Sequence, residues 1–225
     1  MTTRKEIKEA KKADLKRALE LDPAATSEWQ IKHTYAGYKA LCGYRKAHWY
    51  WERGHKKIAE LISYRYRQKT NVEIHPGAVI GKGIFIDHGA GIVIGETAVV
   101  GDLCILYQGV TLGGTGKQSG KRHPTLEQDV QVSAGAKVLG AITIGEHSKI
   151  GANSVVIKDV PPYSTVVGVP GRVVRHMARE LQIWIKYYSQ TQLWMSSEEF
   201  IRISKIFVVR LVLKTILIQS HKKNI

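Results

Sequence analysis

The sequence predicts an α+β protein in which a helical N-terminal segment precedes a solenoid of short strands. The main observation is a six-residue period, which places aliphatic residues at Leu126, Val132, Val138, Ile144, Ile150 and Val156. Small or β-branched residues follow four places after each, and Gly, Asn and charged residues fill much of the space between. This period fits neither an amphipathic helix nor an alternating strand, whereas it suits flat strands joined by tight corners. Corners need residues that tolerate positive φ, which explains the Gly and Asn.

The same period continues upstream, with one slip of two residues, through Ile74, Ile80, Ile86, Ile94, Val100, Leu106 and Leu112. This register resembles that of the hexapeptide-repeat family, whose members fold as left-handed parallel β-helices with three hexads per coil. The handedness is implied by the resemblance, because the general rule for parallel crossover connections is right-handed.

Three segments are expected: a helical domain over 1–70, a left-handed β-helix catalytic domain over 71–177, and a C-terminal tail over 178–225. The tail is rich in aromatic and aliphatic residues, and its pattern does not decide between helix and strand. Its apolar run over 206–218 is short and interrupted by two charges, so we do not expect it to span a bilayer.

Apolar spacing predicts a first helix over 4–21. Asp22 and Pro23 resemble a helix start, with aspartate as the N-cap and proline in the first turn. A helical pattern then runs to about residue 66 with a break at Gly54, and Ile58 and Leu61 are expected to be buried.

The net charge is +15, but its distribution matters more than its size. Residues 1–70 carry 17 Lys and Arg against 8 Asp and Glu, and residues 178–225 carry 8 against 3, whereas residues 71–177 carry 9 against 8. The aromatic residues of the basic N-terminal segment follow helical spacing, which favours solvated basic helix faces over a nucleic-acid surface. We therefore expect no nucleic-acid partner.

The cysteine content and the first residues favour a cytoplasmic protein. Only Cys42 and Cys104 are present, which fits a reducing compartment. Cys104 stands at a small-residue position of a hexad, so we expect it to be a core residue. The first twelve residues are charged throughout, which excludes a signal peptide in this stretch. No membrane association is expected.

The solenoid has two irregularities, and irregularities in a repeat are common places for function. The first is the slip at 87–91, which carries His88. The second is a stretch of fourteen residues from Leu112 to Leu126 where six would continue the period. The excess is a basic, Gly-rich loop that contains Arg122 and His123.

His88 and Glu73 are fifteen residues apart, a little less than one coil of eighteen, so a carboxylate and an imidazole could lie in adjacent coils. In that arrangement the carboxylate orients the ring and the ring takes a proton from the hydroxyl of a substrate. Arg122 could clamp a carboxylate through its planar fork. The spacing alone leaves open that His88 and Glu73 are exposed corner residues and that Arg122 and His123 belong to a solvated loop.

Seven motifs together resemble serine O-acetyltransferase over about residues 20–176. They are DPAA at 22–25, EIHPGA at 73–78, IDHGAG at 86–91, VIGETA at 93–98, VTLGGTGK at 110–117, KRHP at 121–124 and GVPGR at 168–172. The resemblance implies transfer of an acetyl group from acetyl-CoA to the hydroxyl of L-serine, which gives O-acetyl-L-serine for cysteine biosynthesis.

The resemblance also implies roles for individual residues. His88 would be the general base and Glu73 its orienting carboxylate, where many members have Asp. The serine ammonium would bind to Asp22 and Asp87, and the serine carboxylate to Arg122 and His123. For the co-substrate acetyl-CoA the implied contacts are Gly114, Ala134, Lys149 and Ala152. No metal is implied.

The family's active site lies between neighbouring subunits of a trimer, so a homotrimer is expected, with a hexamer of two trimers as the larger alternative. Family tails often end in an isoleucine that enters the active site of O-acetylserine sulfhydrylase, and this chain ends in Ile225. The residues before Ile225 are basic rather than acidic, which departs from the family pattern.

Three rival functions share the predicted fold. A solenoid hydratase would need three histidine ligands for zinc, for which His75, His88, His123 and His147 are available. A hexapeptide acetyltransferase could use another hydroxyl or amino acceptor. A non-catalytic trimeric scaffold would turn over no acetyl-CoA.

Overall fold

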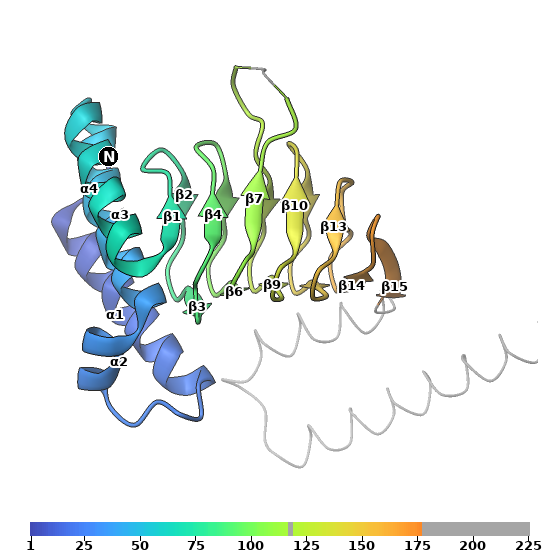
Figure 1. Ribbon diagram of the computed structural model, residues 1–225, viewed down its shortest axis with the longest axis horizontal. Coiled ribbons are helices and arrows are strands. Elements are labelled where there is room, and N and C mark those ends of the chain that lie inside the picture. Colours follow the sequence, from blue (N-terminus) through green and yellow to red (C-terminus); the bar gives the residue numbers. More distant parts are fainter. Residues whose placement is uncertain (117–118, 177–225) are drawn as a thin grey trace, which may run out of the picture. The chain divides into compact units, whose positions relative to one another are not determined.

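The computed structural model describes residues 1–116 and 119–176, and residues 1–176 form one compact unit. The expectations for the tail over 178–225, including a partner that binds Ile225, lie outside the described residues. Four helices precede fifteen short strands within the described residues (Figure 1). The helices are α1 Arg4–Leu21, α2 Glu28–Thr34, α3 Ala36–Glu52 and α4 Lys56–Thr70.

The first helix has the predicted bounds, because Thr3 and Glu6 form a capping box at its start. The prediction that Asp22 begins the next helix is wrong. Asp22 instead ends α1 by donating its backbone N–H to the Ala18 carbonyl, and α2 begins at Glu28 after an N-cap at Ser27. The Asp22 carboxylate accepts the N–H of Ala24, so its side chain stabilises a turn rather than a helix start.

The break between α3 and α4 lies at Gly54 as predicted, with φ of +79°. The prediction that Ile58 and Leu61 are buried is wrong, since both are about half exposed. The helix α4 packs through its opposite face, where Ala59 is fully buried and Tyr66 lies against Gly43 of α3. Gly43 is required there, because a Cβ would lie 2.1 Å from the Tyr66 ring.

Apart from the last strand, which pairs antiparallel, the strands stack into a parallel β-solenoid of about five coils, as the repeat predicts for a left-handed β-helix. Sheet A contains β1 Val72–Ile74, β4 Ile92–Ile94, β7 Thr111–Gly113, β10 Lys137–Leu139 and β13 Val155–Val156. Sheet B contains β2 Val79–Ile80, β5 Val99–Val100, β8 Thr125–Leu126 and β11 Thr143–Ile144. Sheet C contains β3 Phe85–Asp87, β6 Ile105–Tyr107, β9 Gln131–Val132, β12 Lys149–Ile150, β14 Ser164–Val167 and β15 Arg172–His176.

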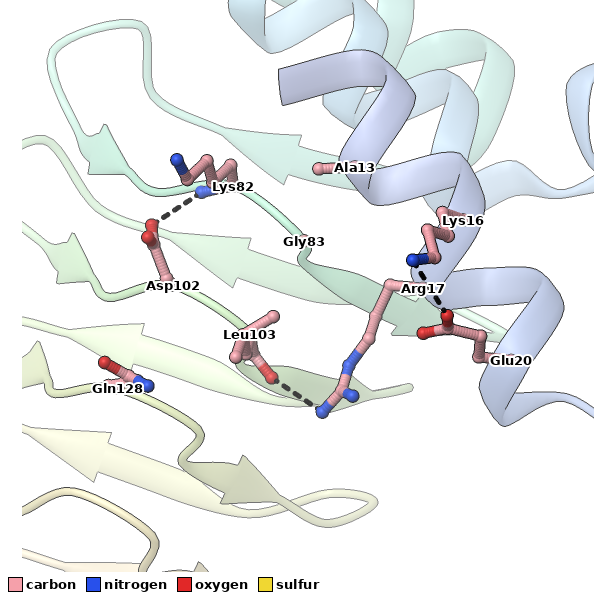
Figure 2. A pocket seen from close by; sticks show the side chains of 9 residues that line it. All are labelled: Ala13, Lys16, Arg17, Glu20, Lys82, Gly83, Asp102, Leu103 and Gln128. Atoms are coloured by element: carbon pink, nitrogen blue, oxygen red, sulfur yellow. Dashed lines mark hydrogen bonds and ion pairs between the residues drawn. The ribbon is translucent and has the colours of Figure 1, made fainter. Parts of the chain in front are cut away.

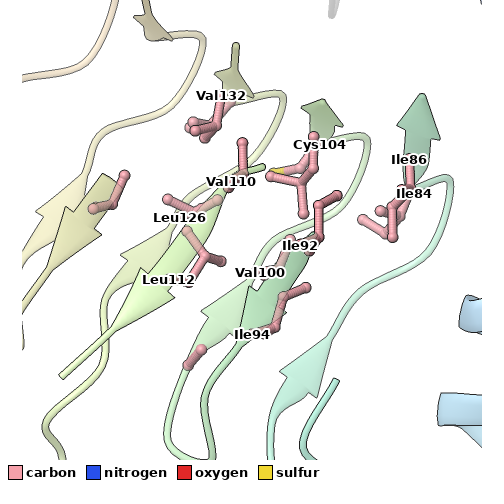
Figure 3. Close-up of a cluster of buried hydrophobic side chains, with 14 of the residues drawn as sticks. Ile84, Ile86, Ile92, Ile94, Val100, Cys104, Val110, Leu112, Leu126 and Val132 are labelled. Atoms are coloured by element: carbon pink, nitrogen blue, oxygen red, sulfur yellow. The ribbon is translucent and has the colours of Figure 1, made fainter. Parts of the chain in front are cut away.

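The interior of the solenoid is filled by the aliphatic residues of the six-residue period (Figure 3). Every member of the two predicted series is buried, from Ile74 to Val156. Cys104 is also a fully buried core residue, as expected, and burial raises the pKa of its thiol to about 12. Burying one aliphatic side chain contributes about 1.5–3 kcal/mol, so the repeat stabilises each coil through its own residues.

Three columns of turns join the sheets, and each is named here after one of the candidate histidines that it carries. The His88 corner (residues 88–91, 108–110, 133–136 and 151–154) leads from sheet C to sheet A. The His123 corner (75–78, 95–98, 114–124 and 140–142) leads from sheet A to sheet B, and the His147 corner (81–84, 101–104, 127–130 and 145–148) leads from sheet B to sheet C.

The inserted loop leaves the register of the solenoid unchanged. Thr111 of β7 pairs with Val93 of β4, eighteen residues earlier, and with Lys137 of β10, twenty-six residues later. The difference of eight residues is the length of the insertion, since fourteen residues replace six. Figure 1 shows the loop rising from the stack after β7, so the insertion is accommodated at the His123 corner alone.

A buried ion pair attaches the helices to the first coil. The Asp14 carboxylate of α1 accepts hydrogen bonds from Arg45 of α3 at 2.7 Å and from the Ile84 N–H at 2.9 Å. Arg45 also donates to the Gly81 carbonyl at 2.8 Å. This network fixes α1 and α3 against the solenoid and thereby sets the position of the α1–α2 turn next to β3.

Candidate active site

A pocket of about 310 Å³ lies between the helices and the end of β3. Its polar lining comes from Asp22 after α1, Thr34 at the end of α2, Tyr35 before α3, Asp87 at the end of β3 and His88 at the start of the His88 corner. The start of α3 approaches β3 closely because residue 37 is glycine, where a Cβ would lie 2.2 Å from the Ile86 carbonyl oxygen. Three residues predicted for serine binding and catalysis, Asp22, Asp87 and His88, therefore share one pocket.

His88 presents its imidazole to solvent at the edge of this pocket. Its backbone is left-handed, with φ of 57°, and its side chain is 72% exposed. The Nε2 atom lies 3.9 Å from the Asp87 carboxylate, which is beyond hydrogen-bond distance. The ring is thus free to accept a proton from a molecule bound in the pocket.

Asp22 and Tyr35 form a hydrogen-bonded pair in the wall of the pocket. The Tyr35 phenol donates to Asp22 Oδ2 at 2.5 Å. This bond and the Ala24 N–H lower the pKa of Asp22, so the carboxylate is ionised at neutral pH. Burial and the same bond raise the pKa of Tyr35 to about 12. The pair therefore holds one fixed negative charge beside a second carboxylate at Asp87, a suitable environment for an ammonium group.

Glu73 lies in β1 with its side chain on the outer face of sheet A. The turn after His88 packs on the start of this strand, since the Gly91 N–H donates to the Asn71 carbonyl at 2.8 Å. The Glu73 carboxylate lies 3.1 Å from Arg67 of α4 and makes no hydrogen bond with His88. Its role as the orienting carboxylate remains a prediction.

Arg122 and His123 form a second cluster at the His123 corner. The Arg122 guanidinium donates to Glu96 at 2.6 Å, and this hydrogen bond lowers the pKa of Glu96. His123 is buried and its Nδ1 atom lies 2.9 Å from the Thr97 hydroxyl. Burial, followed by the neighbouring Arg122, lowers the pKa of His123, so its ring is neutral at pH 7.

The two clusters lie at opposite ends of β4 within one chain. The His88 corner precedes this strand and Glu96 and Thr97 follow it. Gly91 and Glu96 are five residues apart, which corresponds to roughly 16 Å of extended chain. One chain therefore does not bring Arg122 and His123 to His88.

The residues expected to contact acetyl-CoA also divide between two corners. Ala134 and Ala152 occupy successive turns of the His88 corner, where the Asn153 N–H donates to the Ala134 carbonyl at 2.8 Å. Lys149 is exposed at the start of β12, one strand before that corner. Gly114 lies at the other corner, where its Cα faces the backbone of Arg122. The stacked turns leave a row of small residues next to His88.

Tyr35, Glu96 and Thr97 contact the predicted site residues, although sequence reasoning assigned them no functional role. The repeat register contained a signal for the contacts of Glu96 and Thr97. Glu96 and Thr97 each lie twenty-six residues before their partners Arg122 and His123, which is one coil of eighteen plus the eight inserted residues. Tyr35 carried no such signal, because its contact with Asp22 depends on a turn that was predicted to be a helix start.

The four histidines considered as zinc ligands lie at three different corners. His75 and His123 are at the His123 corner, whereas His88 is alone at its corner and His147 bonds Asp129 at 3.0 Å at the third. Among residues 1–116 and 119–176, no group of three or more His, Cys, Asp or Glu side chains is arranged to hold a metal ion. No helix in this part of the chain is long and apolar enough to cross a bilayer.

Another pocket, of about 290 Å³, lies between α1 and the His147 corner (Figure 2). Four of its charged side chains, those of Lys16, Arg17, Glu20 and Asp102, are paired with one another or with backbone atoms. Lys16 pairs with Glu20, the Arg17 guanidinium donates to the Leu103 carbonyl, and Asp102 accepts the Lys82 N–H. None of the predicted site residues lines it.

Comparison with known proteins identifies the family. Residues 123–158 match the family described as bacterial transferase hexapeptide (six repeats). Over 163 residues the chain is 55% identical to a serine acetyltransferase of Bacillus subtilis, and this match covers 72% of the chain and 75% of the relative. The chain belongs to the serine acetyltransferase family. It is also 59% identical over 162 residues to the serine acetyltransferase of Synechococcus elongatus, which covers 72% of this chain and 66% of that protein, slightly less than two thirds of its length.

Solved structures of serine acetyltransferases share the fold. The Neisseria gonorrhoeae serine acetyltransferase in complex with serine is 41% identical, with a TM-score of 0.74 over 76% of this chain and 70% of that one. The soybean serine acetyltransferase complexed with serine is 46% identical, with a TM-score of 0.73 over 76% and 70%. These sequence identities lie well above the range in which two proteins share only a fold.

Proposed function

We propose that this serine acetyltransferase family member transfers the acetyl group of acetyl-CoA to the hydroxyl of L-serine, giving O-acetyl-L-serine and CoA, the first step of cysteine biosynthesis. The observation that carries this proposal is the pocket in which an exposed imidazole, His88, adjoins two carboxylates, Asp22 and Asp87. His88 as a base, next to two carboxylates that can bind an ammonium group, suits a small substrate that carries both an amino group and a hydroxyl. Two similar structures are described as complexes with serine, which supports the same substrate.

The serine zwitterion would be bound at both ends. Asp22 and Asp87 would hold the ammonium, and the charged fork of Arg122 with His123 would hold the carboxylate. Because these groups lie at opposite ends of β4, the clamp would come from a neighbouring copy of the chain in a homotrimer. The site would then be complete only in the assembly, and a hexamer of two such trimers would contain the same site.

His88 would act as general base. It would take the proton of the serine hydroxyl as the oxygen attacks the thioester carbonyl of acetyl-CoA, and a tetrahedral intermediate would form. Collapse of the intermediate would break the carbon–sulfur bond, and His88 would return the proton to the departing thiolate. Glu73 would orient the ring once its carboxylate leaves Arg67. Acetyl-CoA would lie along the row of small residues that includes Ala134 and Ala152, with Lys149 and Gly114 at its edges.

A thiol-release assay tests the proposal. L-Serine should support release of CoA, and D-serine, homoserine, a galactoside and chloramphenicol should support far less. Loss of a general base typically lowers kcat about 10²–10⁴-fold, so we expect that reduction for His88→Ala. His33→Ala, at an exposed position of α2, is the matched control. Near-normal turnover in the His88 variant would reject this residue as the base, and preference for another acceptor would reassign the substrate.

The composite site has its own test. Chains carrying His88→Ala and chains carrying Arg122→Ala are each expected to be almost inactive alone. When the two are refolded together, random trimers should restore about a quarter of the sites, because each site draws one residue from each of two chains. If verified mixed trimers recovered no activity, His88 and Arg122 of one site would have to come from the same chain.

A further inference from the structure

The side chain of Thr97 is saturated by hydrogen bonds to the two residues of the proposed carboxylate clamp. Its Oγ1 atom accepts the backbone N–H of Arg122 at 3.0 Å and the backbone N–H of His123 at 3.1 Å. A hydroxyl oxygen has two lone pairs, so both are used. Its single proton is therefore available only for donation, and the acceptor within reach is His123 Nδ1 at 2.9 Å.

A second donor reaches the same ring nitrogen. The backbone N–H of Thr97 points at His123 Nδ1 with an N···N distance of 3.2 Å. A main-chain N–H can only donate, so Nδ1 must be the unprotonated nitrogen of the ring. The proton of the neutral imidazole is therefore on Nε2. This assignment follows from the two donors that face the ring nitrogen.

The ring has little freedom to adopt another arrangement. It lies directly over Gly95, where a Cβ would lie 2.0 Å from His123 Cδ2 and 2.1 Å from Nε2. Rotating the ring by half a turn would put a carbon opposite both Thr97 donors and lose two hydrogen bonds. Within the described residues Nε2 makes no hydrogen bond, so its N–H remains available for a ligand.

We propose that Thr97 is a positioning residue that fixes His123 as a neutral Nε2–H donor for the carboxylate of the acceptor substrate. The proposal rests on the proposed function. Thr97 holds the backbone of Arg122 and both the backbone and the ring of His123, whereas Glu96 holds the Arg122 guanidinium. The two groups that would face the substrate, the Arg122 guanidinium and the His123 Nε2–H, are then both hydrogen-bond donors. Two donors suit a carboxylate, which accepts hydrogen bonds.

This assignment separates the roles of the two histidines. The lone pair of His123 is occupied by Thr97, so His123 cannot remove a proton from the substrate. The ring of His88 makes no hydrogen bond in the described part of the chain and keeps its lone pair available. Thr97 thus contributes to specificity for an amino acid with a free carboxylate over an amino alcohol that lacks one.

Substitutions at both positions test the inference. Thr97→Val keeps the shape but removes the hydroxyl, and should raise the KM for serine roughly tenfold with little change in the KM for acetyl-CoA. Thr97→Ser keeps the hydroxyl and should restore the wild-type KM. Thr111→Val, in β7, is the matched control, since the Thr111 hydroxyl makes no hydrogen bond to the residues that the structure describes. Ethanolamine lacks the carboxylate, so its slow turnover should be the same in the wild type and in Thr97→Val.

The donor role has a separate readout. The side-chain amide of glutamine can place an N–H where Nε2–H stands, but it cannot act as a base. His123→Gln should therefore retain much more serine turnover than His123→Ala. Equal loss in both variants, or an unchanged serine KM in Thr97→Val, would overturn the inference.

Nitrogen NMR of the wild-type protein with labelled histidine should show His123 as the Nε2–H tautomer at pH 7. Another tautomer or a charged ring would overturn the inference whether or not the variants fold. The spectrum needs no turnover, so it still reports on Thr97 if the wild-type protein fails to acetylate serine. That failure would be seen in the wild-type assay and would reject the proposed function instead.

Discussion

The Tyr35 phenol donates a hydrogen bond of 2.5 Å to the Asp22 carboxylate and so joins the residue that ends α1 to the residue that precedes α3. Both side chains line the pocket that contains His88. The bond keeps one carboxylate oxygen of Asp22 fixed and leaves the other to the Ala24 N–H and to a ligand.

Tyr35→Phe should raise the KM for serine with a smaller effect on kcat. A hydrogen bond to a charged group contributes about 1.5–3 kcal/mol, which corresponds to roughly ten- to a hundredfold in affinity. Steady-state kinetics with serine varied at saturating acetyl-CoA measures this effect. Tyr163→Phe, at a tyrosine whose ring centroid lies 4.8 Å from that of His147, serves as the control and should leave the KM unchanged. A selective fall in kcat would instead connect Tyr35 with the chemical step.

Gly95→Ala should displace the His123 ring, since the new Cβ would lie 2.0 Å from Cδ2. The expected result is a folded protein with a serine KM raised on the order of tenfold or more, because the ring can move only by giving up its bonds to Thr97. Gly116→Ala lies in the inserted loop, where a Cβ would meet nothing within 4 Å, and should behave like the wild type. Identical kinetics in the two variants would mean that the ring position does not matter for serine binding.

Asp14→Ala should destabilise the protein by about 3–5 kcal/mol, because it leaves the buried Arg45 guanidinium without its counter-ion. The side chains of Asp14 and Arg45 are 0% and 7% exposed. Urea unfolding at one fixed protein concentration measures the loss. The exposed pair Lys16–Glu20 provides the control, and Glu20→Ala should change stability by less than about 0.5 kcal/mol. Replacing both Asp14 and Arg45 by apolar residues should recover much of the loss.

The folded protein should lose stability as the pH falls below about 6.5, the pKa of histidine in an unfolded chain. Burial lowers the pKa of both His75 and His123 in the folded state. Between the folded and unfolded pKa values the unfolded chain binds more protons, so acid favours unfolding. Urea midpoints at pH 7.5 and 5.5 test this, and His123→Gln should reduce the difference. The lowered pKa values of Asp22 and Glu96 add a further loss only at more acidic pH, below about 4.5.

The solenoid could be predicted from the sequence because each coil repeats one local pattern. Ile144 and Ile150 point inward for the same reason as Ile80 and Ile86, so a period read along the chain gives the core directly. The sequence also located the two irregularities that carry His88 and Arg122. In a repeat, local spacing determines long-range contacts, which is seldom true of other folds.

The helical part was predicted less well because its contacts depend on tertiary packing. Asp22 has the residue type of an N-cap, but its carboxylate bonds a turn and Tyr35 instead. Ile58 and Leu61 have the spacing of a buried face, yet α4 packs through Ala59 and Tyr66. The pairing of Asp14 with Arg45, thirty-one residues apart, has no periodic signal and could not be derived from the pattern.

The inserted loop leaves and rejoins the stack at positions that pair as if it were absent. Its length and composition are therefore uncoupled from the assembly of the coils. Segments of other sizes, grafted between Thr115 and Gly120, should fold with the same scaffold, because Arg122 and His123 then keep their hydrogen bonds to Thr97. They would present new side chains near the proposed acceptor substrate. That part of the corner is a natural place to diversify acceptor choice by design, while the residues proposed to bind acetyl-CoA and the carboxylate of serine remain untouched.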